Sequence, residues 1–386
     1  MIDSPHMEII DLSPAVLHWA ASQSGGGLSD IAVRVSKKSA EKITAGQLTY
    51  PQVLKYAKLT GVPLGFLFLS EPPEQRRAPL ADFRTLPDAH PLSKDFFEVF
   101  DDIELKHAWV RERLLAEGAT PLEFVGKYGE KRPAAEALAS EIREFLEFND
   151  AALRALRNSD ELFAYLVDQC EKNGIFVFKN GVVGNNTSRP LSVSEFRGFA
   201  IADPLSPIIF INGADAPAAW VFTLAHELAH IWIGDSGISD AATTTHNGIE
   251  RYCNAVAGEF LVPKSRFLAV WAELPEESSD VRLDVARRTF KVSKTVVARR
   301  AYDLGLITHD QYFQVYNLAR KAAKDKKSGG GDFYRSLAVR NSKALTMQIS
   351  NLAVSGAMTL TEAGRLLNTT PNNVVKLYEK RNAISI

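Results

Sequence analysis

The sequence is poor in cysteine, and Cys170 and Cys253 are the only two among its 386 residues. Two cysteines cannot form the disulfide framework of a small secreted domain, and their scarcity fits a reducing compartment. Long hydrophobic runs are also missing, and the N-terminal segment has no basic stretch followed by an apolar core. These absences predict a soluble, cytoplasmic protein that has no membrane partner.

An excess of charge of either sign is missing as well. The sequence contains 45 Lys and Arg against 46 Asp and Glu, so its formal net charge is −1. This balance argues against a globally basic nucleic-acid-binding protein, although a local basic patch remains compatible with it. The apolar fraction of 46% and the charged fraction of 24% are typical of a folded protein and disfavour a disordered or collagen-like chain.

Composition and apolar spacing divide the chain into five parts. Short helical patterns fill the first part, and charged amphipathic helical patterns fill the second. A charged and then glycine-rich stretch, which cannot bury apolar surface, precedes the last part. The predicted parts are a small helical module at 1–78, a helical connector at 79–165 that packs on the core, a core at 166–323, a linker at 324–332 and a helical tail at 333–386.

The core combines strand and helix patterns. Three short runs rich in β-branched and aromatic residues, at 174–178, 196–203 and 207–212, are bounded by Gly, Pro, Asn and Asp. They predict a small three-stranded sheet. Helical spacing of apolar residues returns at 216–233 and at 249–261. The sequence therefore predicts a mostly helical α+β protein.

Two of the eight histidines, His226 and His230, lie four residues apart with Glu227 between them. On a helix, residues four apart share one face, so both imidazoles can bind one Zn²⁺, while Glu227 lies about 100° away and can hold a water molecule. Asp215 is the predicted N-cap of this helix, and Pro217 suits its first turn. The alternative is that the two histidines only pack or face solvent.

A catalytic zinc ion usually has three protein ligands. Asn247 and Glu250 have the spacing of a capping box that opens the next helix, where Glu250 and Asn254 share one face. Glu250 could complete a His, His, Glu set, or it could be a solvated first-turn carboxylate that the helix dipole favours. Cys253, one turn along, is either a buried packing residue or a thiol that responds to zinc or oxidants.

Three segments of the core resemble the ImmA/IrrE family of zinc metallopeptidases. They are 196–203, 222–230 with the HExxH motif, and 250–263, which has the family's E-x-x-A-N-x-F-A-x-E-L-L-x-P form. The resemblance extends from about 162 to 306, with Cys253 where the family usually has Ala and Val256 where it has an aromatic residue. It implies that His226, His230 and Glu250 are the zinc ligands and that Glu227 is the general base.

The resemblance also implies an activity and a class of substrate. The expected reaction is cleavage of a protein by a zinc-dependent endopeptidase, and the expected substrate is a transcriptional repressor of a stress response or a mobile element. The candidate transition-state stabilisers are His246, Tyr252 and Arg197. The strand at 208–211 is expected to bind an extended peptide through its backbone.

The N-terminal module resembles the Xre-type helix-turn-helix, with a recognition helix that begins near Ser36. Lys37, Lys38 and Lys42 are therefore candidate contacts to double-stranded DNA. However, the Trp-Glu-x-Gly motif that follows the recognition helix in the Xre-type family is replaced here by Ile-Thr-Ala-Gly at 43–46. In addition, 36–44 has no Arg, Asn or Gln to read bases. The module could instead serve packing or protein contacts.

The tail carries a second helix, turn and helix pattern, at 359–378. It predicts either DNA contact or a bundle that serves dimerisation or caps the core. The alternative to an enzyme is a DNA-binding transcriptional regulator or antitoxin-like protein in which the core senses a signal or binds a partner.

Overall fold

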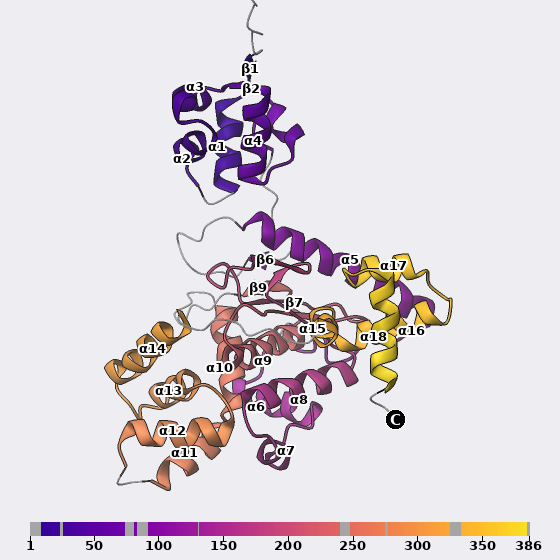
Figure 1. Ribbon diagram of the computed structural model, residues 1–386. Coiled ribbons are helices and arrows are strands. Elements are labelled where there is room, and N and C mark those ends of the chain that lie inside the picture. Colours follow the sequence, from indigo (N-terminus) through magenta and orange to yellow (C-terminus); the bar gives the residue numbers. More distant parts are fainter. Residues whose placement is uncertain are drawn as a thin grey trace, which may run out of the picture. The chain divides into compact units, whose positions relative to one another are not determined.

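The computed structural model describes residues 9–23, 26–73, 81–82, 92–129, 131–239, 248–274, 277–324 and 333–383. The chain divides into two units, Met1–Ala78 and Pro79–Ile386, and each is described by itself (Figure 1). The described residues are mostly helical, with one five-stranded and two two-stranded sheets, which is consistent with an α+β protein. Among them, no helix is both long enough and apolar enough to span a membrane.

The first unit is a bundle of short helices around a small apolar core. Its elements are β1 (Ile9–Asp11), α1 (Pro14–Gln23), α2 (Leu28–Val35), η1 (Lys37–Ser39), α3 (Ala40–Thr44), β2 (Gln47–Thr49), α4 (Tyr50–Thr60) and η2 (Leu64–Phe68). The buried hydroxyl of Tyr56 donates a hydrogen bond of 2.7 Å to the carbonyl of Leu17, which ties α4 to α1. Lys37, Lys38 and Lys42 are exposed on η1 and α3, where the recognition helix is expected.

The second unit is built on a mixed sheet of order β3-β9-β7-β8-β4. Its strands are β3 (Ala81–Asp82), β4 (Phe176–Asn180), β7 (Gly198–Ile201), β8 (Ile208–Asn212) and β9 (Gly237–Ser239). The three predicted strands are confirmed as β4, β7 and β8. The prediction of a three-stranded sheet is wrong, because β3 and β9 extend it to five. These two strands have two and three residues, too few to show a periodic pattern.

The prediction that 208–211 binds a peptide as an edge strand is wrong. Strand β8 pairs in parallel with β4 on one side and antiparallel with β7 on the other, so both of its backbone edges are used within the sheet. All five of its residues are buried. A run of consecutive apolar residues is typical of a strand covered on both faces, and such a strand lies inside a sheet. A separate hairpin joins β5 (Val182–Val183) to β6 (Asn186–Pro190).

Helices cover both faces of this sheet (Figure 1). On one face, Phe199 of β7 and Phe210 of β8 stack with ring centroids 4.9 Å apart, and Phe96 and Phe100 of α5 pack against Phe199. On the other face, alternate strand residues join the main core with α9. The helices of this part are α5 (Lys94–Ala116), α6 (Ala135–Phe145), α7 (Asp150–Ala155), α8 (Ser159–Lys172), α9 (Pro217–Ile233), α10 (Gly248–Leu261), α11 (Lys264–Ala272), α12 (Ser279–Phe290), α13 (Lys294–Asp303) and α14 (His309–Lys324).

Helix α9 is the central helix of the core, and every residue from Thr223 to Ile233 is buried. Pro217 stands in its first turn, as predicted. The prediction that Asp215 is the N-cap is wrong, because the N-cap is Ala216 and no side chain caps the helix. The Asp215 carboxylate instead accepts a hydrogen bond of 2.7 Å from the amide of Ala216 and lies 3.4 Å from Arg197. Asp215 is thus one residue before the N-cap, and its carboxylate binds the Ala216 amide rather than the amides of the first helical turn that an N-cap side chain would bind.

The tail helices pack on the core through a half-buried carboxylate, that of Glu171. They are α15 (Phe333–Arg340), α16 (Lys343–Val354), α17 (Leu360–Leu366) and α18 (Pro371–Ala383), and the last two confirm the predicted helix, turn and helix. Glu171 of α8 accepts hydrogen bonds from the Ser342 hydroxyl at 2.6 Å and from the amides of Lys343 and Ala344 at 2.9 and 3.0 Å. A carboxylate from the core therefore caps the N-terminus of α16.

Asp203 fixes the turn between β7 and β8. Its carboxylate accepts hydrogen bonds of 2.9 and 3.0 Å from the amides of Leu205 and Ser206, and one of 2.9 Å from the Arg111 guanidinium on α5. Burial alone would raise the pKa of Asp203, but these hydrogen bonds and the nearby His107 lower it overall. The ionised form is therefore the one that stabilises the fold.

We expect Asp203→Asn to lower the free energy of unfolding by about 1–3 kcal/mol at neutral pH, since charge-assisted hydrogen bonds are lost. A lowered pKa means that this stability is complete above the ordinary value of 3.8 and is lost as pH falls through the folded value. The difference between variant and wild type, measured by urea unfolding, should therefore shrink in acid. Asp310→Asn, at an exposed side chain, is the control. A difference that stays constant down to pH 2.5 would contradict the assignment.

Candidate metal centre

Helices α9 and α10 bring three potential metal ligands together. His226 and His230 lie one turn apart on α9, and Glu250 is in the first turn of α10. The Nε2 atoms of the two histidines are 3.1 Å apart. Glu250 Oε1 is 3.1 Å from His230 Nε2, and its Oε2 is 3.2 Å from His226 Nε2. The close packing of the two helices is helped by Ala257, a small and fully buried residue on α10.

The three donor atoms fit a divalent metal ion. Bonds of about 2.0–2.1 Å to a tetrahedral zinc ion place neighbouring ligand atoms about 3.3 Å apart, which is close to the separations observed here. Two imidazoles and one carboxylate are also the donor set of many catalytic zinc sites. All three side chains are buried, with relative exposures of 3%, 0% and 1%. A search of the described residues for His, Cys, Asp and Glu side chains close enough to share a metal ion finds this trio.

Burial and mutual contacts shift the pKa values of all three groups, and the shifts of His230 and Glu250 favour the deprotonated forms that bind a metal. Burial lowers the pKa of His230, so this imidazole is neutral at pH 7. Burial opposes the charge of Glu250, but hydrogen bonds with the two histidines lower its pKa to about 2. Burial likewise opposes the charge of His226, yet Glu250 and Glu227 raise its pKa. Because a metal ligand must be deprotonated, metal binding would release any proton that His226 holds.

Glu227 is buried beside the ligands and against the backbone of β7. A Cβ atom added to Gly198 would lie 2.9 Å from Glu227 Oε1, 2.8 Å from the Phe210 carbonyl and 2.7 Å from the Thr223 side chain. Only glycine therefore allows strand β7 to approach α9 this closely. The glycine is visible in the sequence motif at 196–200, but its contact with Glu227 is visible only in the tertiary structure. Glu227 itself is fully buried on the helix that carries both histidines.

Asn254 supports the cluster from α10. Its Oδ1 lies 3.0 Å from Nδ1 of His226, so His226 can donate this hydrogen bond and keep Nε2 available for a metal. The sequence analysis placed Asn254 on the same helix face as Glu250 but did not predict this contact. It also did not identify Asp235, just beyond α9, as a charged neighbour of His230. Burial raises the pKa of Asp235.

We expect Asn254→Ala to weaken zinc binding by about 10- to 100-fold, the usual effect of removing a hydrogen bond that orients a ligating histidine. Competition with a chromogenic chelator measures the affinity. Asn254→Asp should preserve most of it, because the carboxylate can accept the same hydrogen bond. Equal zinc affinities for wild type and Asn254→Ala would show that this contact does not orient His226.

The predicted transition-state stabilisers are not all near the ligands. Tyr252 lies two residues after Glu250, about 200° around α10, and its hydroxyl donates a hydrogen bond of 3.0 Å to the carbonyl of Pro133. That hydroxyl is thus used elsewhere. Arg197 precedes Gly198 in the chain and lies 3.4 Å from Asp215. His246 is outside the described residues.

Cys253 is buried in the main core, where burial raises the pKa of its thiol well above the ordinary value. A thiol that stays protonated is a poor ligand and a slow nucleophile. Cys170 is likewise a buried free cysteine of the same core. The packing interpretation of Cys253 is therefore the better one.

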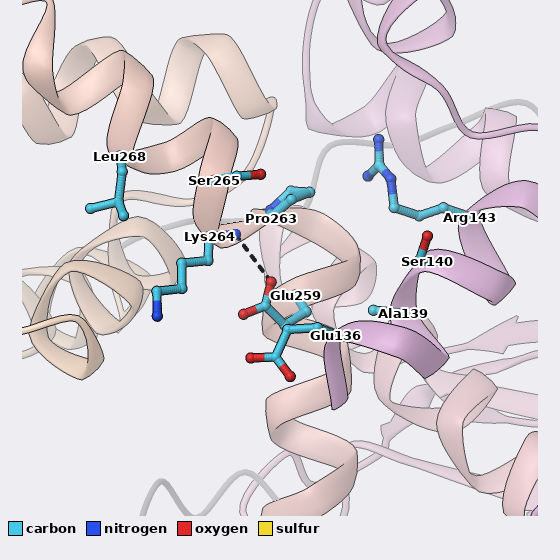
Figure 2. Close-up of a pocket in the computed structure, with 9 residues that line it drawn as sticks. All are labelled: Glu136, Ala139, Ser140, Arg143, Glu259, Pro263, Lys264, Ser265 and Leu268. Atoms are coloured by element: carbon cyan, nitrogen blue, oxygen red, sulfur yellow. Dashed lines mark hydrogen bonds between the residues drawn. The ribbon is translucent and has the colours of Figure 1, made fainter. Parts of the chain in front are cut away.

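A pocket of about 580 Å³ lies between α6, the end of α10 and α11 (Figure 2). It contains none of the candidate metal ligands. Two of its charged groups have partners: Glu259 accepts a hydrogen bond from the Lys264 amide and pairs with Arg300, and Arg143 donates to the Phe260 carbonyl. This pocket therefore adds nothing to the chemistry of the metal cluster.

Comparison with known families agrees with this geometry. Residues 170–302 match the family model Peptidase_M78, described as the IrrE N-terminal-like domain. The matched segment includes α9 and α10, and so all three candidate ligands and Glu227. The match supports the resemblance to the ImmA/IrrE family and a metallopeptidase-like core. No curated protein and no solved structure gives a significant match.

Proposed function

We propose that the protein is a zinc-dependent endopeptidase. The observation that carries the proposal is the buried His226, His230 and Glu250 cluster, with Glu227 beside it on the same helix. A zinc site that only stabilises a fold normally has four protein ligands and needs no neighbouring carboxylate. Three ligands and a nearby base are instead typical of metallopeptidases. The match to a peptidase family over this segment supports the same reaction class.

In this proposal three side chains bind the metal and a fourth transfers the proton. His226, His230 and Glu250 hold the zinc ion, which when bound activates a water molecule and polarises the scissile carbonyl. Glu227 accepts the proton from the attacking water and later donates it to the leaving amine. Asn254 keeps His226 in the right orientation, and the bare backbone of Gly198 leaves space for the carboxylate of Glu227.

We infer the substrate class from the family resemblance alone. It is a transcriptional repressor of a stress response or a mobile element, whose cleavage would relieve repression. The exposed Lys37, Lys38 and Lys42 of the N-terminal unit suit a contact with double-stranded DNA, which would bring the enzyme to the same operator.

The second candidate is a DNA-binding regulator in which the core binds metal without hydrolysing peptides. The observation that favours it is the helical N-terminal unit with three exposed lysines on η1 and α3. In that case, DNA binding should fall steeply with salt and weaken in a Lys37→Gln, Lys38→Gln, Lys42→Gln variant of the full chain.

A single preparation tests both functions. The full chain is assayed for zinc content, for DNA binding at several salt concentrations and for cleavage of candidate repressors encoded near its gene, before and after removal of metal with a chelator. The proposal requires zinc near one equivalent, loss of cleavage on chelation and recovery with added zinc. Stoichiometric zinc without cleavage, together with salt-dependent DNA binding, would favour the regulator.

A further inference from the structure

A pocket of about 380 Å³ lies where the helical tail meets the core. Its walls come from α8, β4, the first turn of α9, and helices α15 and α16 of the tail. A volume of this size can enclose a small organic molecule. The residues that give the pocket its chemistry are Phe163, Lys179, Trp220, Arg335 and Lys343.

Lys179 places a positive charge against the aromatic wall of this pocket. Its Nζ lies 3.4 Å from the ring centroid of Trp220 and 4.9 Å from that of Phe163. Within the described residues, this ammonium has neither a hydrogen bond nor a carboxylate within 4.0 Å; Asp160 acts on it only from a greater distance. Burial lowers the pKa of Lys179 to about 8. A half-buried cation with so little compensation would gain from an anion beside it.

Trp220 supplies a hydrogen-bond donor at the same place. Its Nε1 is buried and has no acceptor among the described residues. A buried N–H group without an acceptor costs free energy, which an acceptor on a ligand would restore. The rings of Phe163 and Trp220 lie 5.7 Å apart and form an apolar wall. The pocket thus combines a cation, a donor and an aromatic surface.

The tail adds to the positive charge of the pocket. Arg335 and Lys343 line it from α15 and α16, and Asp160 is the acidic residue among the lining side chains. Lys343 is paired with Asp168 at 2.7 Å, so its charge is partly neutralised. Lys179 has no such carboxylate neighbour, so its charge is the one that favours an anion in the pocket.

We propose that this pocket binds a small amphiphilic anion, with a carboxylate or phosphate-type head on a flat apolar body. The head accepts hydrogen bonds from Lys179 and from the indole of Trp220, and the body packs against Phe163. Such a ligand contacts both the tail and the first turn of α9, the helix that also carries His226. The site does not depend on the proposed peptidase activity, and none of its lining residues is a candidate metal ligand.

Isothermal titration of the full-length, zinc-loaded protein tests this site. The probes are 3-phenylpropionate and phenylphosphonate, which present the two heads on similar bodies, with inorganic phosphate and neutral 3-phenyl-1-propanol as comparisons. At least one aromatic anion should bind about tenfold or more tightly than either comparison, because only it satisfies the head and the body together. Which of the two binds more tightly identifies the head. Equal binding of the neutral alcohol, or of phosphate alone, would overturn the proposal.

Two variants and one control locate the binding. Lys179→Gln should weaken the better anion about tenfold or more, and Trp220→Phe, which keeps an aromatic ring, should weaken it by about three- to tenfold. Lys172→Gln removes the same charge from an exposed position at the end of α8 and should change nothing. Circular dichroism and thermal melting check that each variant folds. Equal weakening by Lys172→Gln and Lys179→Gln would show that only net charge matters.

The indole of Trp220 gives an independent readout. The chain has five tryptophans, so its indole N–H signals in a ¹⁵N spectrum can be assigned by comparison with Trp220→Phe. Binding of the anion should move the Trp220 signal downfield, as expected for a newly formed hydrogen bond, and leave that of Trp271 in place. A Trp220 signal that does not move at saturation would overturn the assigned donor.

Discussion

Glu227→Gln is expected to lower the rate of repressor cleavage by about 10²- to 10⁴-fold, the range of general acid–base catalysis. Glutamine has nearly the same shape, so it should occupy the same buried space next to Gly198. It cannot accept the proton from water at neutral pH. The loss should therefore appear in kcat, with little change in KM.

The zinc content of this variant separates catalysis from metal binding. Glu227 is not one of the three clustered ligands, so Glu227→Gln should still contain about one zinc ion per chain. Glu144→Gln, at an exposed position on α6, is the matched control and should retain full activity. If Glu227→Gln cleaves as fast as wild type, Glu227 is not the general base. If it loses zinc, the ligand assignment must be revised.

Glu250→Gln is expected to weaken zinc binding by more than about 100-fold, since removal of a direct ligand should exceed the effect of removing a residue that only orients one. The amide is neutral and donates protons from one of its two positions, whereas both carboxylate oxygens of Glu250 face histidine nitrogens. Activity should fall with zinc occupancy, and high zinc should restore part of it. Chelator competition and metal analysis measure the affinity.

Glu259→Gln, on the same helix, is the control for this experiment. Glu259 is also buried, but it pairs with Arg300 and accepts a hydrogen bond from the Lys264 amide. Its replacement should lower the melting temperature and leave the zinc affinity unchanged. Zinc should also raise the melting temperature of wild type, because a ligand that binds only the folded state stabilises it. This shift should be absent in Glu250→Gln. Unaltered zinc affinity in Glu250→Gln would exclude this carboxylate as a ligand.

The sequence predicted the metal cluster well because its signals are local. Helical periodicity alone places His226 and His230 on one face, and a second amphipathic segment predicts α10 with Glu250 in its first turn. The structure then brings these residues within 3.1–3.2 Å of one another. The three strands β4, β7 and β8 were also predicted, because runs of branched and aromatic residues bounded by turn residues are typical of buried strands.

The order of the strands in the sheet could not be predicted from such local signals. The apolar run at 208–211 shows that a strand is buried on both faces, but not which strands pair with its edges. The prediction of a free edge failed because β4 joins β8 in parallel from more than twenty residues earlier in the chain. The strands β3 and β9 were missed because segments of two and three residues are too short to show an alternating pattern.

By itself, the sequence determined the helices, the three main strands and the set of metal-binding residue types, since each depends on spacing along the chain. Tertiary structure alone decided what touches these elements. It placed Gly198 against Glu227, Asn254 on His226 and Glu171 at the start of α16, and it formed the pocket around Lys179 from segments that are far apart in sequence. Such contacts depend on how whole helices and strands pack, and no local pattern of residues encodes that packing.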